Sequence, residues 1–138
     1  MGIDSALNSL VRHRARSTCE YCRLPEAESD LLFTIDHIIA RQHGGCTVET
    51  NLALACPCCN LHKGPNIAGI DRDSGILSPL FNPRPNRWTE HFRWDGVAIA
   101  PITAIGRTTV TALAMNDPRQ IAVRRVMLSS GWLLQSEL

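Results

Sequence analysis

Four of the six cysteines in this chain lie in two pairs with the spacing of metal ligands. Cys19/Cys22 and Cys56/Cys59 both have the CxxC pattern. Each pair can present two thiolates to one tetrahedral ion, so the two pairs together predict a structural zinc site. Residues 23–55 separate the pairs, and this insert is longer than the roughly 15–20 residues of a simple zinc ribbon. We therefore expect further structure between the two pairs.

Other uses of the cysteines fit the sequence less well. A disulfide framework belongs to secreted proteins, and the N-terminal segment shows no secretion signal. A thioredoxin-like redox pair is expected beside a βαβ pattern, which surrounds neither CxxC pair. Cys46 and Cys58 remain unassigned. We interpret them as small buried residues, although Cys58 could compete for the metal.

Polar residues with catalytic potential recur within the insert and directly after the second cysteine pair. An acid and a histidine are adjacent at the end of an apolar stretch, a Gly-Gly pair follows, and an asparagine opens a second apolar stretch. In chain order the residues are Asp36-His37, Gly44-Gly45, Asn51 and Asn60, followed by His62 and Lys63. Each piece alone occurs by chance, so the information lies in their order and in their interleaving with both cysteine pairs.

Taken together, the segments CEYC, DHIIARQHGG and NLALACPCCNLHKG resemble the HNH endonucleases, whose core is a ββα-metal fold. The chain is most similar to the small bacterial stand-alone members that carry a four-cysteine zinc site. The matching motifs cover residues 19–64. The stretch DRDSGILSPLFNPRPNRWTEHFRWDG, with the helices predicted after it, also resembles the extension of one such bacterial group.

The resemblance implies a metal-dependent endonuclease that hydrolyses DNA phosphodiester bonds and leaves 3′-hydroxyl and 5′-phosphate ends. His37 would be the base that activates water, a role suited to an imidazole with an ordinary pKa of about 6.5. Asp36 and Asn60 would hold the catalytic ion, and their oxygen atoms suit Mg²⁺ or Mn²⁺. Asn51 would brace the loop and orient His37. Asn60 stands where histidine is also found in the family, which implies a weaker site for a harder metal.

The roles of His62 and Lys63 are open at this point. His62 could bind metal, contact phosphate or do neither, and Lys63 is expected to contact a backbone phosphate. On a helix, His62 would lie about 200° around the axis from Asn60. Both side chains therefore cannot serve the same ion without distortion of the turn.

Two other functions remain as alternatives. The first is a non-catalytic zinc-stabilised nucleic-acid-binding module, and the second is a zinc-ribbon module for protein interaction. The intact set of Asp36, His37 and Asn60 favours catalysis, because a pure binder has no need of a base beside a metal ligand. Taken singly, Asp36 could accept loop hydrogen bonds, His37 could be a structural histidine and Asn51 could cap a turn.

The elements that must position these residues follow from hydrophobic periodicity and turn residues. In the first half we expect a helix at 3–14, strands at 31–39 and 51–55, an irregular loop at 41–50 and a helix at 58–63. In the second half we expect residues 66–87 to wrap over the surface without forming a core. A short helix at 86–92 capped by Asn86, a hairpin at 92–99 and helices at 103–115 and 118–129 follow.

These elements predict an α+β fold in a single domain. Residues 1–18 would carry the N-terminal helix, residues 19–66 a small ββα-metal core with the zinc site, and residues 67–138 an extension of a hairpin and helices. With 44% hydrophobic residues and a net charge of +1, the composition is that of a globular chain. No apolar run reaches the roughly 18 residues of a membrane span, so we expect a cytoplasmic protein without membrane contact.

The type of basic residue says more about a DNA partner than the net charge does. All basic residues except Lys63 are arginine, and arginine suits bidentate phosphate binding. A GC-rich genome would also raise the arginine content. The residues that we expect to bind DNA phosphates are Arg12, Arg14, Arg16, Arg84 and Arg87.

Overall fold

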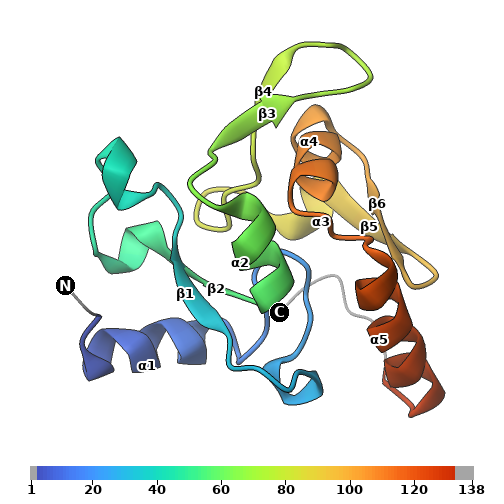
Figure 1. Cartoon of the computed structure of the whole chain (residues 1–138), viewed down its shortest axis with the longest axis horizontal. Coiled ribbons are helices and arrows are strands. Elements are labelled where there is room, and N and C mark those ends of the chain that lie inside the picture. The colour runs from blue at the N-terminus through green and yellow to red at the C-terminus, as the bar shows by residue number, and fades with distance from the viewer. Residues whose placement is uncertain (1–2, 133–138) are drawn as a thin grey trace.

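The described part of the chain, residues 3–132 of a computed structural model, has an α+β fold of helices and three separate pairs of antiparallel strands (Figure 1). Residues 1–2 and 133–138, the ends of the predicted N-terminal and C-terminal parts, lie outside the described residues. Within the described helices, none is long and apolar enough to cross a bilayer.

The first half contains the elements expected around the candidate site. Helix α1 (Ser5–Arg14) begins where the Asp4 side chain accepts a hydrogen bond from the Leu7 N–H, as a helix cap does. Strand β1 (Thr34–His37) pairs antiparallel with β2 (Leu52–Ala55), and His37 lies opposite Leu52. Strand β1 is shorter than the predicted 31–39: its pairing with β2 covers Thr34 to His37, and Leu31 and Leu32 ahead of it are exposed.

Helix α2 (Pro57–Lys63) follows β2 directly and completes a ββα unit. Cys56 caps it: the Cys56 sulfur accepts from the Cys59 N–H. The helix ends at Gly64, which has a φ of 51° that L residues rarely adopt. Helix α2 contacts β1, and α1 contacts β2, so the strand pair is held by a helix from either side of the sequence (Figure 1).

The second half begins with a hairpin that the sequence prediction missed. Strands β3 (Ala68–Ile70) and β4 (Leu77–Pro79) pair antiparallel. The prediction that residues 66–87 form no core is wrong, since Asp71, Leu80 and Phe81 are buried. Helix α4 (Ala104–Ala112) contacts both strands, and Arg107 of α4 makes two 2.9 Å hydrogen bonds to Asp71.

The remaining elements follow the predictions closely. Helix α3 (Trp88–His91) leads into β5 (Phe92–Asp95), which pairs with β6 (Ala98–Pro101) as the predicted hairpin. Helix α5 (Pro118–Ser129) has the predicted bounds, and the Asp117 side chain caps it by accepting from the Arg119 N–H. The predicted Asn86 cap of α3 is wrong: Arg87 precedes that helix, and the Asn86 side chain accepts from the Asn82 N–H instead.

The C-terminal part packs on the first cysteine loop. The buried Trp88 ring donates its N–H to the Tyr21 carbonyl at 2.8 Å. The Arg23 guanidinium lies over the same ring, 5.2 Å from its centre. Arg84 pairs with Glu20, which in turn accepts from the Leu54 N–H of β2. These contacts fix the residues between the first two cysteines to both halves of the chain.

Candidate metal and catalytic site

The four predicted zinc ligands lie together in the interior. The sulfur atoms of Cys19, Cys22, Cys56 and Cys59 are all within 4.8 Å of one another, and all four residues are buried. The Cys22 and Cys56 sulfurs are 3.6 Å apart. A tetrahedral zinc ion with Zn–S bonds of about 2.3 Å separates its sulfurs by about 3.8 Å. The cluster therefore fits one zinc ion.

The electrostatics of the cluster also favour a cation. Hydrogen bonding with Cys19, and then with Cys56, raises the pKa of the Cys22 thiol. Hydrogen bonding with Cys19, Cys22 and Cys59 lowers the pKa of Cys56. Four thiols so close together cannot all ionise without a positive charge among them, and metal binding would release the remaining protons.

A glutamine from the C-terminal part covers this cluster. The Gln120 Nε2 atom of α5 lies 3.6 Å from the Cys56 sulfur and 3.7 Å from the Cys22 sulfur. Gln120 is buried. Donors to metal-bound thiolates hold ligands in place and tune the site, so α5 has a direct contact with the candidate zinc centre.

The two other cysteines lie outside the cluster. Cys46 is exposed, so the prediction that it is a buried hydrophobic residue is wrong. Cys58 is half-buried, and burial raises its pKa to about 11. Its sulfur lies 3.6 Å from Nδ1 of His62, one turn along α2. Cys58 does not compete for the four-cysteine site.

Asp36 lies in the interior, on the strand that contacts α2. Its side chain is 7% exposed, and Oδ2 accepts from the Tyr21 hydroxyl at 2.7 Å. The Lys63 ammonium lies 3.1 Å from Oδ2 and 3.4 Å from Oδ1. Burial raises the pKa of Asp36, while Lys63 and Tyr21 act in the opposite direction. Both neighbours stabilise the carboxylate in its charged form.

Lys63 is placed differently from the prediction. Its side chain is 2% exposed. Besides Asp36, the ammonium donates to the carbonyls of His37 at 3.3 Å and Ile38 at 3.0 Å. An ammonium enclosed in this way does not reach a DNA phosphate. Lys63 instead ties α2 to the end of β1.

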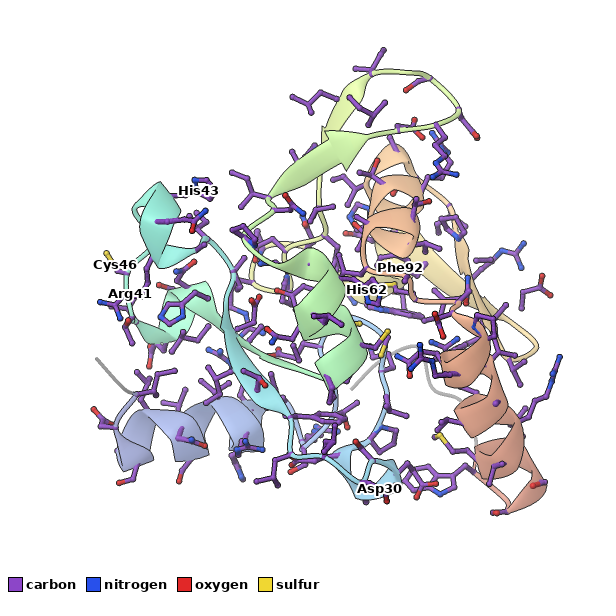
Figure 2. All side chains as sticks on the ribbon, in the orientation of Figure 1. Asp30, Arg41, His43, Cys46, His62 and Phe92 are labelled. Atoms are coloured by element: carbon purple, nitrogen blue, oxygen red, sulfur yellow. The ribbon has the colours of Figure 1, made fainter. Side chains whose placement is uncertain are left out.

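His37 is the last residue of β1 and is half-buried. Its Nε2 atom lies 2.9 Å from the hydroxyl of Thr47. Thr47 belongs to the loop between β1 and β2, the loop on which Figure 2 shows Arg41, His43 and Cys46. The imidazole is thus positioned by a residue of the loop, whereas the neighbouring Asp36 is positioned by Lys63 of α2 and by Tyr21.

Asn51 fixes the two ends of that loop to each other. Its side-chain oxygen accepts from the Ile39 N–H at 2.9 Å, and its Nδ2 donates to the carbonyls of Ile39 at 3.0 Å and Cys46 at 2.9 Å. Gly45 allows this close approach, because a Cβ there would lie 1.7 Å from the Ile39 oxygen. These contacts brace the loop, and the expected orientation of His37 by Asn51 stays a prediction.

Asn60 and His62 lie on different sides of α2. Asn60 is half-buried, its side chain makes no hydrogen bond with residues 3–132, and Lys63 follows it by three positions. Residues three apart share a helix face, so Asn60 lies on the face that Lys63 turns toward Asp36. His62 is exposed, and its Nδ1 lies 2.8 Å from the Cys58 carbonyl (Figure 2).

Comparison with known families gives a match within the first half of the chain. The family model described as HNH endonuclease matches residues 19–66. Residues 19–66 form an HNH domain. The match spans both cysteine pairs, the β1–β2 pair and α2, and leaves the C-terminal part of the chain outside it. No curated protein and no solved structure matched the chain.

Several arginines predicted to contact DNA are occupied by partners in and around the HNH domain. Arg12 makes two bonds to Glu26, at 2.7 and 3.0 Å. Arg14 donates to the carbonyls of Glu49 and Leu52, and Arg84 pairs with Glu20. The guanidiniums of Arg12, Arg14 and Arg84 therefore support the fold, and their contact with DNA stays a prediction. Arg16 and Arg87 are exposed.

Three residues near the HNH site were not singled out from the sequence. Tyr21 holds Asp36, Thr47 holds His37, and Gln120 covers the cysteine cluster. Tyr21 could have been noticed as the aromatic residue within the first CxxC pair. Nothing local in the sequence distinguishes Thr47 or Gln120, since their partners lie 10 and 64 positions away in the chain.

Proposed function

We propose that this protein is a metal-dependent endonuclease that hydrolyses DNA phosphodiester bonds, with His37 as the base that activates water. The observation that carries the proposal is that, inside an HNH domain, a half-buried histidine held by Thr47 directly follows a buried, charge-stabilised aspartate at the end of β1. A protein that only binds nucleic acid has no need to enclose an aspartate with Lys63 and Tyr21 beside an oriented imidazole.

The donor set at this position fits a hard divalent cation such as Mg²⁺ or Mn²⁺. The ligands would be Asp36 and Asn60. Among residues 3–132, Oδ1 of Asp36 has only the 3.4 Å contact with Lys63, so it keeps acceptor capacity. The Asn60 side chain has no hydrogen bond to another described residue. When bound, the ion would supply positive charge to the scissile phosphate and the departing oxygen.

The protein's own residues would carry the proton chemistry and the positioning. His37 would accept the proton of a water molecule as that water attacks phosphorus, and the bond between phosphorus and the 3′ oxygen would break. The departing 3′ oxygen would take up a proton from solvent, leaving a 3′-hydroxyl and a 5′-phosphate. Asn51 would keep the loop beside His37 closed. Lys63 and Tyr21 would keep Asp36 ionised and in place. His62, which turns to Cys58, would have no part in the reaction.

We also propose that the chain acts as a single domain of three parts: the N-terminal helix in residues 1–18, the HNH core in 19–66 and the extension in 67–138. The Trp88–Tyr21 and Gln120–cysteine contacts support this, because they place extension residues directly on the zinc-binding loops.

The test is cleavage of supercoiled plasmid DNA by zinc-loaded protein with Mg²⁺, with Mn²⁺ or with EDTA. We expect metal-dependent nicking or linearisation that His37→Ala reduces by about 10²–10⁴-fold, the usual contribution of a general base. His13→Ala, a change at an exposed histidine of α1, is the matched control. DNA binding without cleavage under every metal condition would contradict the proposal and favour a non-catalytic binding module.

A further inference from the structure

The His37 ring has one hydrogen bond within residues 3–132, and it comes from a side chain outside the predicted site. Nε2 lies 2.9 Å from the Thr47 hydroxyl, and Nδ1 has no hydrogen-bond partner among these residues. A hydroxyl can donate or accept, so this contact permits two tautomers of the ring. In one, Nε2–H donates to Thr47 and Nδ1 carries the lone pair. In the other, Thr47 donates to Nε2 and Nδ1 carries the proton.

The loop that carries Thr47 is held rigidly against β1. The neighbouring Cys46 carbonyl accepts from the Asn51 side chain, which also bonds both backbone groups of Ile39. At Gly45 the loop passes so close that a Cβ would meet the Ile39 oxygen at 1.7 Å. Ile39 lies two residues after His37, so the Thr47 hydroxyl and the His37 imidazole belong to segments that are directly hydrogen-bonded to each other.

We propose that Thr47 is a positioning residue for His37: its hydroxyl accepts Nε2–H, fixes the orientation of the ring and leaves the Nδ1 lone pair to act as the base. The second half of this inference rests on the proposed nuclease function. The alternative tautomer would leave the ring with no free lone pair, because Nδ1 would carry the proton and Nε2 would be occupied by Thr47.

The same contact serves the ring before and after proton transfer. When Nδ1 accepts a proton from the attacking water, the ring becomes an imidazolium with both nitrogens protonated. Nε2–H still donates to Thr47, so the hydroxyl does not need to reorient during the reaction. A partner fixed in this way costs no reorganisation at the reacting step.

The experiment measures the tautomer directly, by nitrogen-15 NMR of the imidazole in zinc-loaded, full-length protein at a pH where the ring is neutral. The His37 signals are those lost in His37→Ala. We expect the Nε2–H tautomer to predominate in the wild type. Its population should fall in Thr47→Val, which keeps the side-chain shape without the hydroxyl. It should predominate again in Thr47→Ser. Thr50→Val, at an exposed threonine of the same loop, is the control and should leave the tautomer unchanged.

Cleavage kinetics separate this inference from the proposed function. Thr47→Val should lower kcat by about 10- to 100-fold, as loss of an orienting partner does, with KM unchanged and with recovery in Thr47→Ser. An Nδ1–H tautomer in the wild type, or unchanged tautomer and kcat in Thr47→Val, would overturn the inference. If Thr47→Val changes the tautomer but no variant, wild type included, cleaves DNA, the nuclease proposal fails while the orienting role of Thr47 stands.

Discussion

Replacement of Lys63 by methionine tests whether the buried ammonium holds the candidate site together. Methionine keeps the length and apolar character of the side chain but removes the charge. Asp36 would retain the Tyr21 hydroxyl as its only remaining partner among those described. The carbonyls of His37 and Ile38 would lose their shared donor. The change therefore leaves the buried Asp36 carboxylate with one hydrogen-bond donor and the two carbonyls without the Lys63 donor.

The expected magnitude follows from this burial. Lys63 is 2% exposed and Asp36 is 7% exposed, and removal of one partner from such a pair costs about 3–5 kcal/mol of unfolding free energy. Arg119 and Asp117 provide the matched control, since their contact is 3.8 Å long and Arg119 is 96% exposed. Arg119→Met should cost at most about 1 kcal/mol, as surface pairs do.

The assay is urea unfolding with zinc held at a fixed saturating concentration, for Lys63→Met, Asp36→Asn and the double variant. Because the two side chains are in contact, the double variant should lose about 1–3 kcal/mol less than the sum of the single losses. A loss in Lys63→Met no larger than that in Arg119→Met, or strictly additive losses in the double variant, would refute the assignment of Lys63 to the interior.

The remaining predictions concern the cysteines and the loop. Zinc removal should unfold the core, so that the cooperative unfolding transition is lost. Gln120→Leu should speed zinc transfer to a chelating dye several-fold, whereas Gln42→Leu, at an exposed glutamine, should not. Equal transfer rates in Gln120→Leu and in the wild type would contradict the contact between Gln120 and the thiolates. Gly45→Ala should destabilise the protein by about 1–3 kcal/mol through overpacking, and an unchanged urea midpoint would argue against the close loop approach. In zinc-loaded protein, Cys46 should be alkylated before the other cysteines, because it is exposed. Alkylation of Cys58, whose pKa is raised to about 11 by burial, should accelerate about tenfold per pH unit until that pKa, and a plateau near pH 9 would contradict it.

Local signals in the sequence were sufficient for some elements and insufficient for others. The bounds of α5 could be predicted because Asp117-Pro118 is a strong helix start. The four-cysteine cluster could be predicted because each pair is defined by its own short spacing. Neither prediction needed knowledge of distant partners.

The misplaced residues have partners that are far away in the chain. The β3–β4 hairpin depends on α4, which supplies Arg107 to Asp71 from 36 positions away. Turn residues alone do not distinguish such a hairpin from a surface loop. Lys63 is buried because β1, more than 25 positions earlier, supplies acceptors for its ammonium. Hydrophobic patterning gives no sign of this, since an isolated lysine is expected at the surface.

The central claim is that the imidazole of His37 activates water for metal-dependent DNA cleavage, and chemical rescue tests it most directly. We would measure single-turnover cleavage of an end-labelled duplex by zinc-loaded wild type, His37→Gly and His13→Gly with Mn²⁺, with and without added imidazole. The account predicts 5′-phosphate products from the wild type and the His13 variant. His37→Gly should be slower by more than about 100-fold and should regain part of its rate with imidazole. Folded wild-type protein that never cleaves DNA, or a His37→Gly variant that cleaves at the wild-type rate, would contradict it.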